Sequence, residues 1–293
     1  MHKAGFVNIV GNPNVGKSTL MNQLVGEKLS IATFKAQTTR HRIMGIVNTE
    51  DTQIVFSDTP GVLKPNYKMQ EMMLQFSESA LADADILLYV TDVVEDPEKN
   101  MDFLEKVSKM SIPVILLINK IDESDQKTLG KLVTKWHGLL PNAEILPISA
   151  KNKFGVDILL KRVHELLPES PAFFDKDQLT DKPAKFFVSE IIREKILRYY
   201  DKEIPYSVEV VIERFKEDDR QIHISAIIYV ERSSQKGIII GHQGMALKKV
   251  STEARKSLER FFDKKIFLET FVKVDKDWRN SQKELKHFGY SLE

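Results

Sequence analysis

The sequence predicts an α/β domain with a mainly parallel six-stranded sheet and flanking helices, followed by a smaller α+β domain. Three observations predict this organisation: apolar runs alternate with helical patterns up to residue 168, a polar segment broken by prolines follows, and the order of elements then changes. The chain has 293 residues, the length of about two ordinary domains. We therefore expect domains at 1–168 and 184–275, a linker at 169–183 and a C-terminal helix or tail at 276–293.

Six short apolar segments of the first domain are candidate strands. Several are nearly continuous Ile, Leu and Val, which is typical of strands covered by helices on both faces. Helical patterns lie between them, as in a mainly parallel sheet. The expected strands are Phe6–Val10, Arg42–Asn48, Gln53–Ser57, Ile86–Thr91, Val114–Asn119 and Ala143–Ile148, and the expected helices are Ser18–Val25, Met69–Ala82, Glu98–Met110, Leu129–Leu139 and Val156–Leu167.

The second domain has a different order of elements, namely helix–strand–strand–helix–helix–strand. Its two first strand segments alternate apolar and polar residues, and a glycine-containing turn precedes its longest helix. The expected elements are a helix at Phe186–Tyr200, strands at Val208–Phe215 and Gln221–Val230, a helix at Met245–Phe262, a strand at Ile266–Val274, and a short helix or tail at Trp278–Leu292.

The composition bounds the class of protein. The chain contains no cysteine, which excludes disulfides and thiolate metal sites and favours a reducing cytosol. Its longest apolar runs are too short to span a bilayer, so we expect a cytoplasmic protein, with a peripheral contact at the inner face of the cell membrane left open. The net charge is +1, yet residues 232–265 hold nine basic and three acidic side chains, which makes this stretch a candidate polyanion site.

The segment Gly11–Ser18, with the sequence GNPNVGKS, has the spacing of a P-loop. It follows an expected strand and opens an expected helix, so backbone N–H groups and the helix N-terminus can face phosphates. Lys17 is expected to reach the β- and γ-phosphates, and the Ser18 hydroxyl to ligate Mg²⁺. The expected nucleotide contacts in this segment are Gly11, Asn12, Pro13, Asn14, Val15, Gly16, Lys17, Ser18 and Thr19.

Two later segments predict that the base is guanine. The Asp122 carboxylate of Asn119-Lys120-Ile121-Asp122 can accept two hydrogen bonds from the N1–H and amino group of guanine, a pair of donors that adenine lacks. Asn119 is expected to tie this loop to the P-loop, and the stem of Lys120 to cover one face of the base. Backbone donors for the guanine carbonyl are expected from Ser149, Ala150 and Lys151.

Two segments are expected to surround the γ-phosphate and to change order upon hydrolysis. Asp58 ends the third strand and is expected to hold Mg²⁺ through water, and the N–H of Gly61 to contact the γ-phosphate. The loop Gln37–Arg40 carries two threonines, one of which is expected to complete the magnesium shell. The nucleotide contacts expected after the third strand are Asp58, Thr59, Pro60 and Gly61.

Taken together, these segments resemble the bacterial GTPases of the Era family, over essentially the whole chain. The resemblance implies that Thr39 is the magnesium ligand and Thr38 its neighbour, and that the second domain is of the KH type. It also implies binding to the 3′ end of small-subunit ribosomal RNA during assembly of the small ribosomal subunit. The residues that carry it are Gly11–Ser18, Thr38 and Thr39, Asp58–Gly61, Asn119–Asp122 and Ser149–Lys151.

One position departs from Ras-like enzymes. Val62 follows Gly61 where those proteins place the glutamine that orients the attacking water. Intrinsic hydrolysis is therefore expected to be slow unless another group replaces it. Related GTPases with asparagine at the position of Asn14 use it to help bind K⁺, so K⁺ is a second candidate cation; the alternative is that Asn14 only supports the loop. The residues expected to take part in hydrolysis are Lys17, Thr39, Gly61 and Asn14.

The turn Gly241–Gly244, with the sequence GHQG, is a candidate clamp for single-stranded nucleic acid. Two glycines three apart let the backbone approach a sugar-phosphate chain, as in the GXXG loop of KH domains. The run Ile238–Ile240 can form a floor for unstacked bases, and two lysines follow on the next helix. The expected RNA contacts are Ile238, Ile239, Gly241, His242, Gln243, Gly244, Lys248 and Lys249.

The leading hypothesis is a molecular switch in which GTP changes how the second domain presents its RNA site. The main alternative is a GTPase regulated by a protein or membrane partner, with the second domain as an interaction module that binds no RNA. A weaker alternative is a metabolic phosphohydrolase. The basic stretch 232–265 favours the first, and we expect a monomer that binds GTP or GDP, Mg²⁺ and single-stranded RNA.

Overall fold

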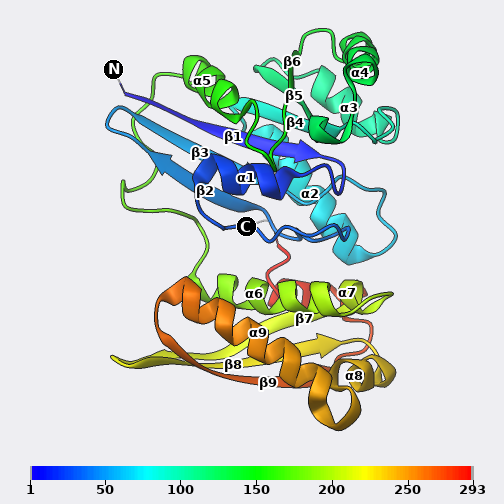
Figure 1. The fold of residues 1–293 in the computed structure, drawn as a ribbon, viewed down its shortest axis with the longest axis vertical. Helices are drawn as coiled ribbons and strands as arrows, with labels where there is room; N and C mark the ends of the chain where they lie inside the picture. Colours follow the sequence, from blue (N-terminus) through cyan, green and yellow to red (C-terminus); the bar gives the residue numbers. More distant parts are fainter. Residues whose placement is uncertain (1, 292–293) are drawn as a thin grey trace. The chain divides into compact units, whose positions relative to one another are not determined.

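The computed structural model describes residues 2–291, which form two compact units (Figure 1). The first comprises residues 2–66 and 70–181, and the second comprises 67–69 and 182–291. Residue 1 and residues 292–293, which the expected domain and tail boundaries include, lie outside the described part of the chain.

The first unit contains a six-stranded sheet in the order β2-β3-β1-β4-β5-β6. All neighbouring strands are parallel except β2 and β3, which are antiparallel. A tight turn joins these two strands, and a 2.8 Å hydrogen bond from the Thr49 N–H to the Thr52 carbonyl closes it. The expected mainly parallel sheet is confirmed. Its strands are β1 (Lys3–Gly11), β2 (Ile43–Asn48), β3 (Thr52–Asp58), β4 (Ile86–Asp92), β5 (Val114–Asn119) and β6 (Glu144–Pro147).

Helices cover both faces of this sheet. On one face α2, α3 and α4 share a core with β1, β4 and β5. In this core the Trp136 ring of α4 packs on the Tyr89 ring of β4, with 5.7 Å between the ring centroids. On the other face α1 contacts β1, β2, β3 and α5. The helices are α1 (Lys17–Val25), α2 (Lys68–Ala82), α3 (Met101–Ser108), α4 (Gln126–Leu139) and α5 (Val156–Leu166).

The strand register brings polar residues to one edge of the sheet. Asp58 lies beside Ile9 of β1, and Asp92 of β4 lies beside Asn119 of β5, so the carboxyl ends of four neighbouring strands meet where α1 begins. In open α/β sheets, ligands bind outside this edge. The apolar interior of each strand fixes its place in the core, and the polar residue that ends it is left at the edge.

The segment expected as a linker is bound along the first sheet as far as residue 181. The Ile46 N–H of β2 donates to the Leu179 carbonyl at 2.8 Å, and the Met44 N–H donates to the Asp181 carboxylate at 2.8 Å. The Gln53 side chain donates to the Phe174 carbonyl at 2.8 Å. The first two bonds satisfy N–H groups of the edge strand β2, and the third pairs a buried side chain of β3, so a polar, proline-broken sequence adopts a fixed path here.

The second unit has a three-stranded sheet in the order β7-β8-β9, in which β7 and β8 are antiparallel and β8 and β9 parallel. Residues of α6, α8 and α9 share one core with the sheet. The elements are α6 (Ala184–Tyr199), α7 (Ile204–Ser207), β7 (Glu209–Glu217), β8 (Gln221–Val230), α8 (Ser233–Ile240), α9 (Met245–Phe262), β9 (Lys265–Val274) and α10 (Gln282–His287). The short α7 was not expected, and α10 gives the predicted short C-terminal helix its bounds. None of the helices within 2–291 has the length and apolarity needed to cross a membrane.

Candidate nucleotide and RNA sites

The P-loop connects β1 to α1 and encloses the amine of Lys17. Lys17 Nζ donates to the carbonyls of Gly11 at 3.0 Å and Asn12 at 2.8 Å. Burial lowers the pKa of Lys17 to about 8, against the opposing charges of Asp58 and Glu95. A buried ammonium is stabilised by an anion beside it, so the loop is suited to a phosphate group.

Three oxygen-bearing side chains converge at the start of α1. Ser18 Oγ lies 2.8 Å from Thr39 Oγ1 and donates to Asp58 Oδ2 at 2.8 Å, and Thr39 Oγ1 lies 3.3 Å from the same carboxylate oxygen. The second oxygen, Asp58 Oδ1, is buried without a hydrogen-bond partner among the described residues, and burial raises the pKa of this carboxyl. Hydroxyl and carboxylate oxygens with one oxygen left over fit a hard divalent cation such as Mg²⁺.

The two threonines of the Gln37–Arg40 loop have different positions. Thr38 Oγ1 lies 2.7 Å from Thr33 Oγ1 and donates to the Lys35 carbonyl at 2.5 Å, so it holds its own loop together. Thr39 instead reaches Ser18 and Asp58. The geometry therefore supports Thr39 as the candidate metal ligand. No group of three or more His, Asp or Glu side chains that could hold another metal occurs within the described part of the chain.

The segment after β3 lies directly on the P-loop. A Cβ atom at Gly61 would come within 2.7 Å of the Pro13 Cα, so the close approach of the two segments requires glycine. The Val62 N–H donates to the Gly11 carbonyl at 3.0 Å, and the Val62 side chain is buried in the core shared with α2 to α4. Val62 thus points away from the phosphate region and offers no group to orient a water.

The predicted base-binding loops are joined through Asn119. Its Nδ2 donates to the Val15 carbonyl of the P-loop at 2.8 Å, and its Oδ1 accepts from the Ala150 N–H at 2.9 Å. Ser149 Oγ donates to Asp122 Oδ1 at 2.6 Å and leaves the exposed carboxylate its other oxygen. One asparagine therefore connects the three loops that the sequence assigned to one nucleotide.

Three polar residues at the end of β4 and in the loop after it also belong to this edge and were not predicted. Asp92 Oδ2 accepts from Lys120 Nζ at 2.5 Å, Glu95 accepts from Thr91 Oγ1 at 2.8 Å, and Asn100 donates to Asn12. Asp92 could have been found from its sequence position, because it ends an apolar strand as Asp58 and Asn119 do. Nothing in the sequence distinguishes Glu95 or Asn100 from other polar loop residues.

In the second unit the Gly241–Gly244 turn connects α8 to α9. His242 and Gln243 are exposed, and Gln243 has a left-handed backbone with φ 51°. The amine of Lys249 lies 4.3 Å from the centroid of the Tyr199 ring, and Lys248 is exposed. The predicted clamp is thus an exposed turn followed by two lysines at the fourth and fifth positions of a helix.

The expected floor of three isoleucines needs correction at Ile239. These residues lie in α8, where successive side chains point about 100° apart, so they cannot share one face. Ile238 is 49% exposed, whereas Ile239 is fully buried in the core of the second unit. The Ile239 carbonyl accepts from the Tyr200 hydroxyl at 2.7 Å, which holds the end of the helix in the core. Ile239 is a core residue, and Ile238 remains available to a ligand.

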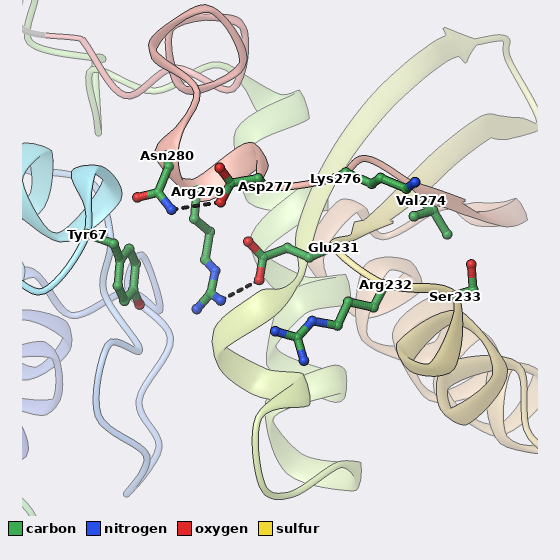
Figure 2. Close-up of a pocket in the computed structure, with 9 residues that line it drawn as sticks. All are labelled: Tyr67, Glu231, Arg232, Ser233, Val274, Lys276, Asp277, Arg279 and Asn280. Atoms are coloured by element: carbon green, nitrogen blue, oxygen red, sulfur yellow. Dashed lines mark hydrogen bonds and ion pairs between the residues drawn. The ribbon is translucent and has the colours of Figure 1, made fainter.

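A separate pocket of about 550 Å³ lies at the other end of α8 (Figure 2). Figure 2 shows the Arg279 guanidinium directed at the Glu231 carboxylate, with which it pairs, and Asn280 donating to Asp277 at 2.7 Å. The eight residues of α8, about 12 Å of helix, separate this pocket from the glycine turn.

Comparisons with known proteins agree with this division of the chain. A family described as "50S ribosome-binding GTPase" matches residues 6–120, and a family described as "KH domain" matches residues 203–279. The expected KH-type fold after the first domain is therefore confirmed.

Curated relatives match over nearly the full length. GTPase Era of Clostridium kluyveri is 44% identical over 292 residues, which cover 99% of this chain and 100% of the relative. GTPase Era of Geobacter sp. strain M21 is 46% identical over 290 residues and 98% of each chain.

Two solved structures match equally well. One is Era in complex with MgGDPNP and nucleotides 1506–1542 of 16S ribosomal RNA, with 37% identity, a TM-score of 0.95 and 100% of both chains covered. The other is a variant of Aquifex aeolicus Era bound to GDP and AlF₄⁻, with 38% identity, a TM-score of 0.94, and 99% of this chain and 100% of that chain covered. Because identity and fold agree along the whole sequence, the chain belongs to the Era family of GTPases.

Proposed function

We propose that this chain is a GTP-hydrolysing molecular switch whose second unit binds the 3′ end of small-subunit ribosomal RNA during assembly of the small subunit. One observation carries the proposal: the loops predicted to bind a guanine nucleotide are joined at one edge of the first sheet, and an exposed GXXG turn occurs in the second unit of the same chain. The Era structure that contains both MgGDPNP and a 16S RNA fragment supports the same pairing of ligands.

In the proposed site, each residue of the first unit has a defined task. Lys17 would neutralise charge on the β- and γ-phosphates, and the Gly61 N–H would hold a γ-phosphate oxygen. Ser18 and Thr39 would hold Mg²⁺ directly and Asp58 through water, and the ion would supply positive charge to the phosphates. Asp122 would select guanine, and Asn119 would keep its loop in register with the P-loop.

K⁺ is the proposed second cation, bound with the help of Asn14. Asn14 is exposed and has a left-handed backbone with φ 67° at the turn of the P-loop, and no glutamine follows Gly61. A cation beside the phosphates would stabilise the charge that an arginine finger stabilises elsewhere. We expect single-turnover hydrolysis to be about tenfold slower or more when K⁺ is replaced by Na⁺. Equal rates in the two salts would leave Asn14 with a supporting role in the loop.

The RNA assignment is tested with a short single-stranded RNA that matches the 3′ end of small-subunit ribosomal RNA. Changing His242 and Gln243 together to Asp places two negative charges on exposed positions, and Asp tolerates the left-handed backbone at 243. We expect RNA binding to be lost while the thermal midpoint and GTP hydrolysis stay unchanged. As the matched control, the exposed pair Asp218 and Asp219 is changed to Asn, which should leave RNA binding intact.

Salt dependence gives a second, independent readout. If phosphate contacts drive the binding, the logarithm of the association constant falls linearly with the logarithm of the salt concentration. The slope is about −0.7 for each phosphate contact to a single strand. Lys248→Ala should make this slope shallower by the value of one contact, about 0.7, since Lys248 is exposed on the helix after the turn. Weak binding that is insensitive to salt and to all of these changes would contradict an RNA function.

A further inference from the structure

Asn100 occupies the N-cap position of α3, but its side chain does not cap the helix. An asparagine there ordinarily accepts a hydrogen bond from a backbone N–H of the first turn. Here the amide is directed to the nucleotide site instead. Asn100 Nδ2 donates to Asn12 Oδ1 of the P-loop and, at 3.1 Å, to the Val62 carbonyl. These two hydrogen-bond partners indicate that the Asn100 side chain has a role other than capping α3.

Both partners belong to segments that bind nucleotide. Asn12 is 3% exposed within the P-loop, and Val62 directly follows Gly61. The Val62 N–H is already held by the Gly11 carbonyl at 3.0 Å. With Asn100 on its carbonyl, Val62 is fixed to the P-loop region from both sides, and the backbone of Gly61 is fixed with it.

The direction of donation is set by the Val62 carbonyl. A carbonyl can only accept a hydrogen bond, so the Asn100 atom that lies 3.1 Å from it is the amide nitrogen Nδ2. The same NH₂ group donates to Asn12 Oδ1. Asn100 therefore meets both partners as a donor.

We propose that Asn100 is a positioning residue for GTP hydrolysis, which ties Asn12 of the P-loop to Val62 and so fixes the Gly61 N–H where the γ-phosphate must be held. The inference rests on the proposed GTPase function of this site. It assigns the control of Gly61 to the loop after β4. The buried side chain of Val62 anchors this segment in the core, and the hydrogen bonds to its N–H and carbonyl set the direction of the adjoining Gly61 backbone.

Two variants separate this role from packing and from helix capping. Asn100→Asp keeps the shape of the side chain but replaces the donor with a carboxylate that faces two acceptors. Aspartate is also as good an N-cap as asparagine, and its charge favours a helix N-terminus. A capping or packing role therefore predicts that this variant is at least as stable as the wild type. The positioning role predicts that it is the slower enzyme. Asn100→Ala removes the donor without adding charge.

The measurements are single-turnover hydrolysis of GTP, and the affinities for GDP and for a non-hydrolysable GTP analogue, in buffer with Mg²⁺ and K⁺. We expect hydrolysis to be about tenfold slower for Asn100→Ala and slower still for Asn100→Asp. Affinity for the analogue should fall, while affinity for GDP should stay within about twofold, since GDP has no γ-phosphate to contact Gly61.

Asn48→Ala is the matched control. Asn48 also makes two side-chain hydrogen bonds, to the Lys176 carbonyl at 3.0 Å and from Gln53 Nε2 at 2.8 Å, but at the opposite edge of the same sheet. It should lower the thermal midpoint without changing the ratio of analogue to GDP affinity. The Asn100 variants should change this ratio whatever their stability.

The outcomes are distinguishable. A wild-type protein that neither binds nor hydrolyses GTP would contradict the proposed function itself. A wild type that hydrolyses GTP, with both Asn100 variants at its rate, would overturn the role of Asn100 alone. Equal losses of GDP and analogue affinity would also overturn it, because they would indicate a general structural defect. A selective loss of hydrolysis and analogue binding supports it.

Discussion

At the scale of single residues, the nucleotide site buries two groups of opposite charge, Lys17 and Asp58. Burial removes water from both, and this desolvation lowers the stability of the fold unless ligands compensate it. Burial disfavours the ammonium of Lys17 and the carboxylate of Asp58, so it lowers the pKa of Lys17 and raises the pKa of Asp58. Phosphates beside Lys17 and a cation beside Asp58 would stabilise the charged form of each residue. The residues that cost folding energy are thus those that we expect to bind GTP and Mg²⁺.

Asp122 carries the sharpest residue-scale prediction. Asp122→Asn should weaken GTP about 10- to 100-fold and strengthen xanthosine triphosphate by a similar factor, because the amide offers a donor where the carboxylate accepted. Fluorescent-nucleotide competition measures both. Glu123→Gln is the control, since Glu123 is an exposed carboxylate in the same short turn. Unchanged GTP affinity in Asp122→Asn would remove this residue from the base site.

At the scale of elements, the sequence predicted two of the polar residues that end strands at the nucleotide edge and missed a third, Asp92. Asp58 and Asn119 follow apolar runs, and parallel strands bring such ends to one edge, so their meeting was predictable. Asn100 was missed because its partners lie 88 and 38 residues away in the chain, and no local pattern encodes them. Ile239 was misassigned because three consecutive apolar residues looked like one surface, which a helix does not provide.

The glycine turn between α8 and α9 gives an element-scale prediction. Gly241 has φ 70° and ψ −178°, a conformation that is nearly restricted to glycine, and an added Cβ would lie 2.6 Å from the Ala246 Cβ. Gly241→Ala should therefore lower the free energy of unfolding by about 1–3 kcal/mol. Gly244 has the ordinary left-handed geometry and open space around it, so Gly244→Asn should cost less than about 1 kcal/mol. Denaturant unfolding of the full chain compares the two, and equal losses would contradict the assigned turn geometry.

At the scale of the whole molecule, two units carry two sites, and the proposed switch is a coupling between them. The fold class and the family could be predicted because the nucleotide motifs recur in fixed order along one sheet. The nature of the coupling could not, because it is a free-energy difference between states and no single residue pattern encodes it. If GTP changes the affinity for RNA, RNA must change the affinity for GTP by the same factor.

The most direct measurement is therefore the affinity for the 3′-terminal ribosomal RNA segment in the presence of a non-hydrolysable GTP analogue and in the presence of GDP. A switch requires RNA affinities that differ by at least about fivefold between the two nucleotide states, and the analogue affinity must change by the same factor when RNA is added. We expect that changing His242 and Gln243 to Asp abolishes both effects. Equal RNA affinity in the two nucleotide states would contradict the switch, and it would leave a GTPase and an RNA-binding unit that share a chain without sharing a function.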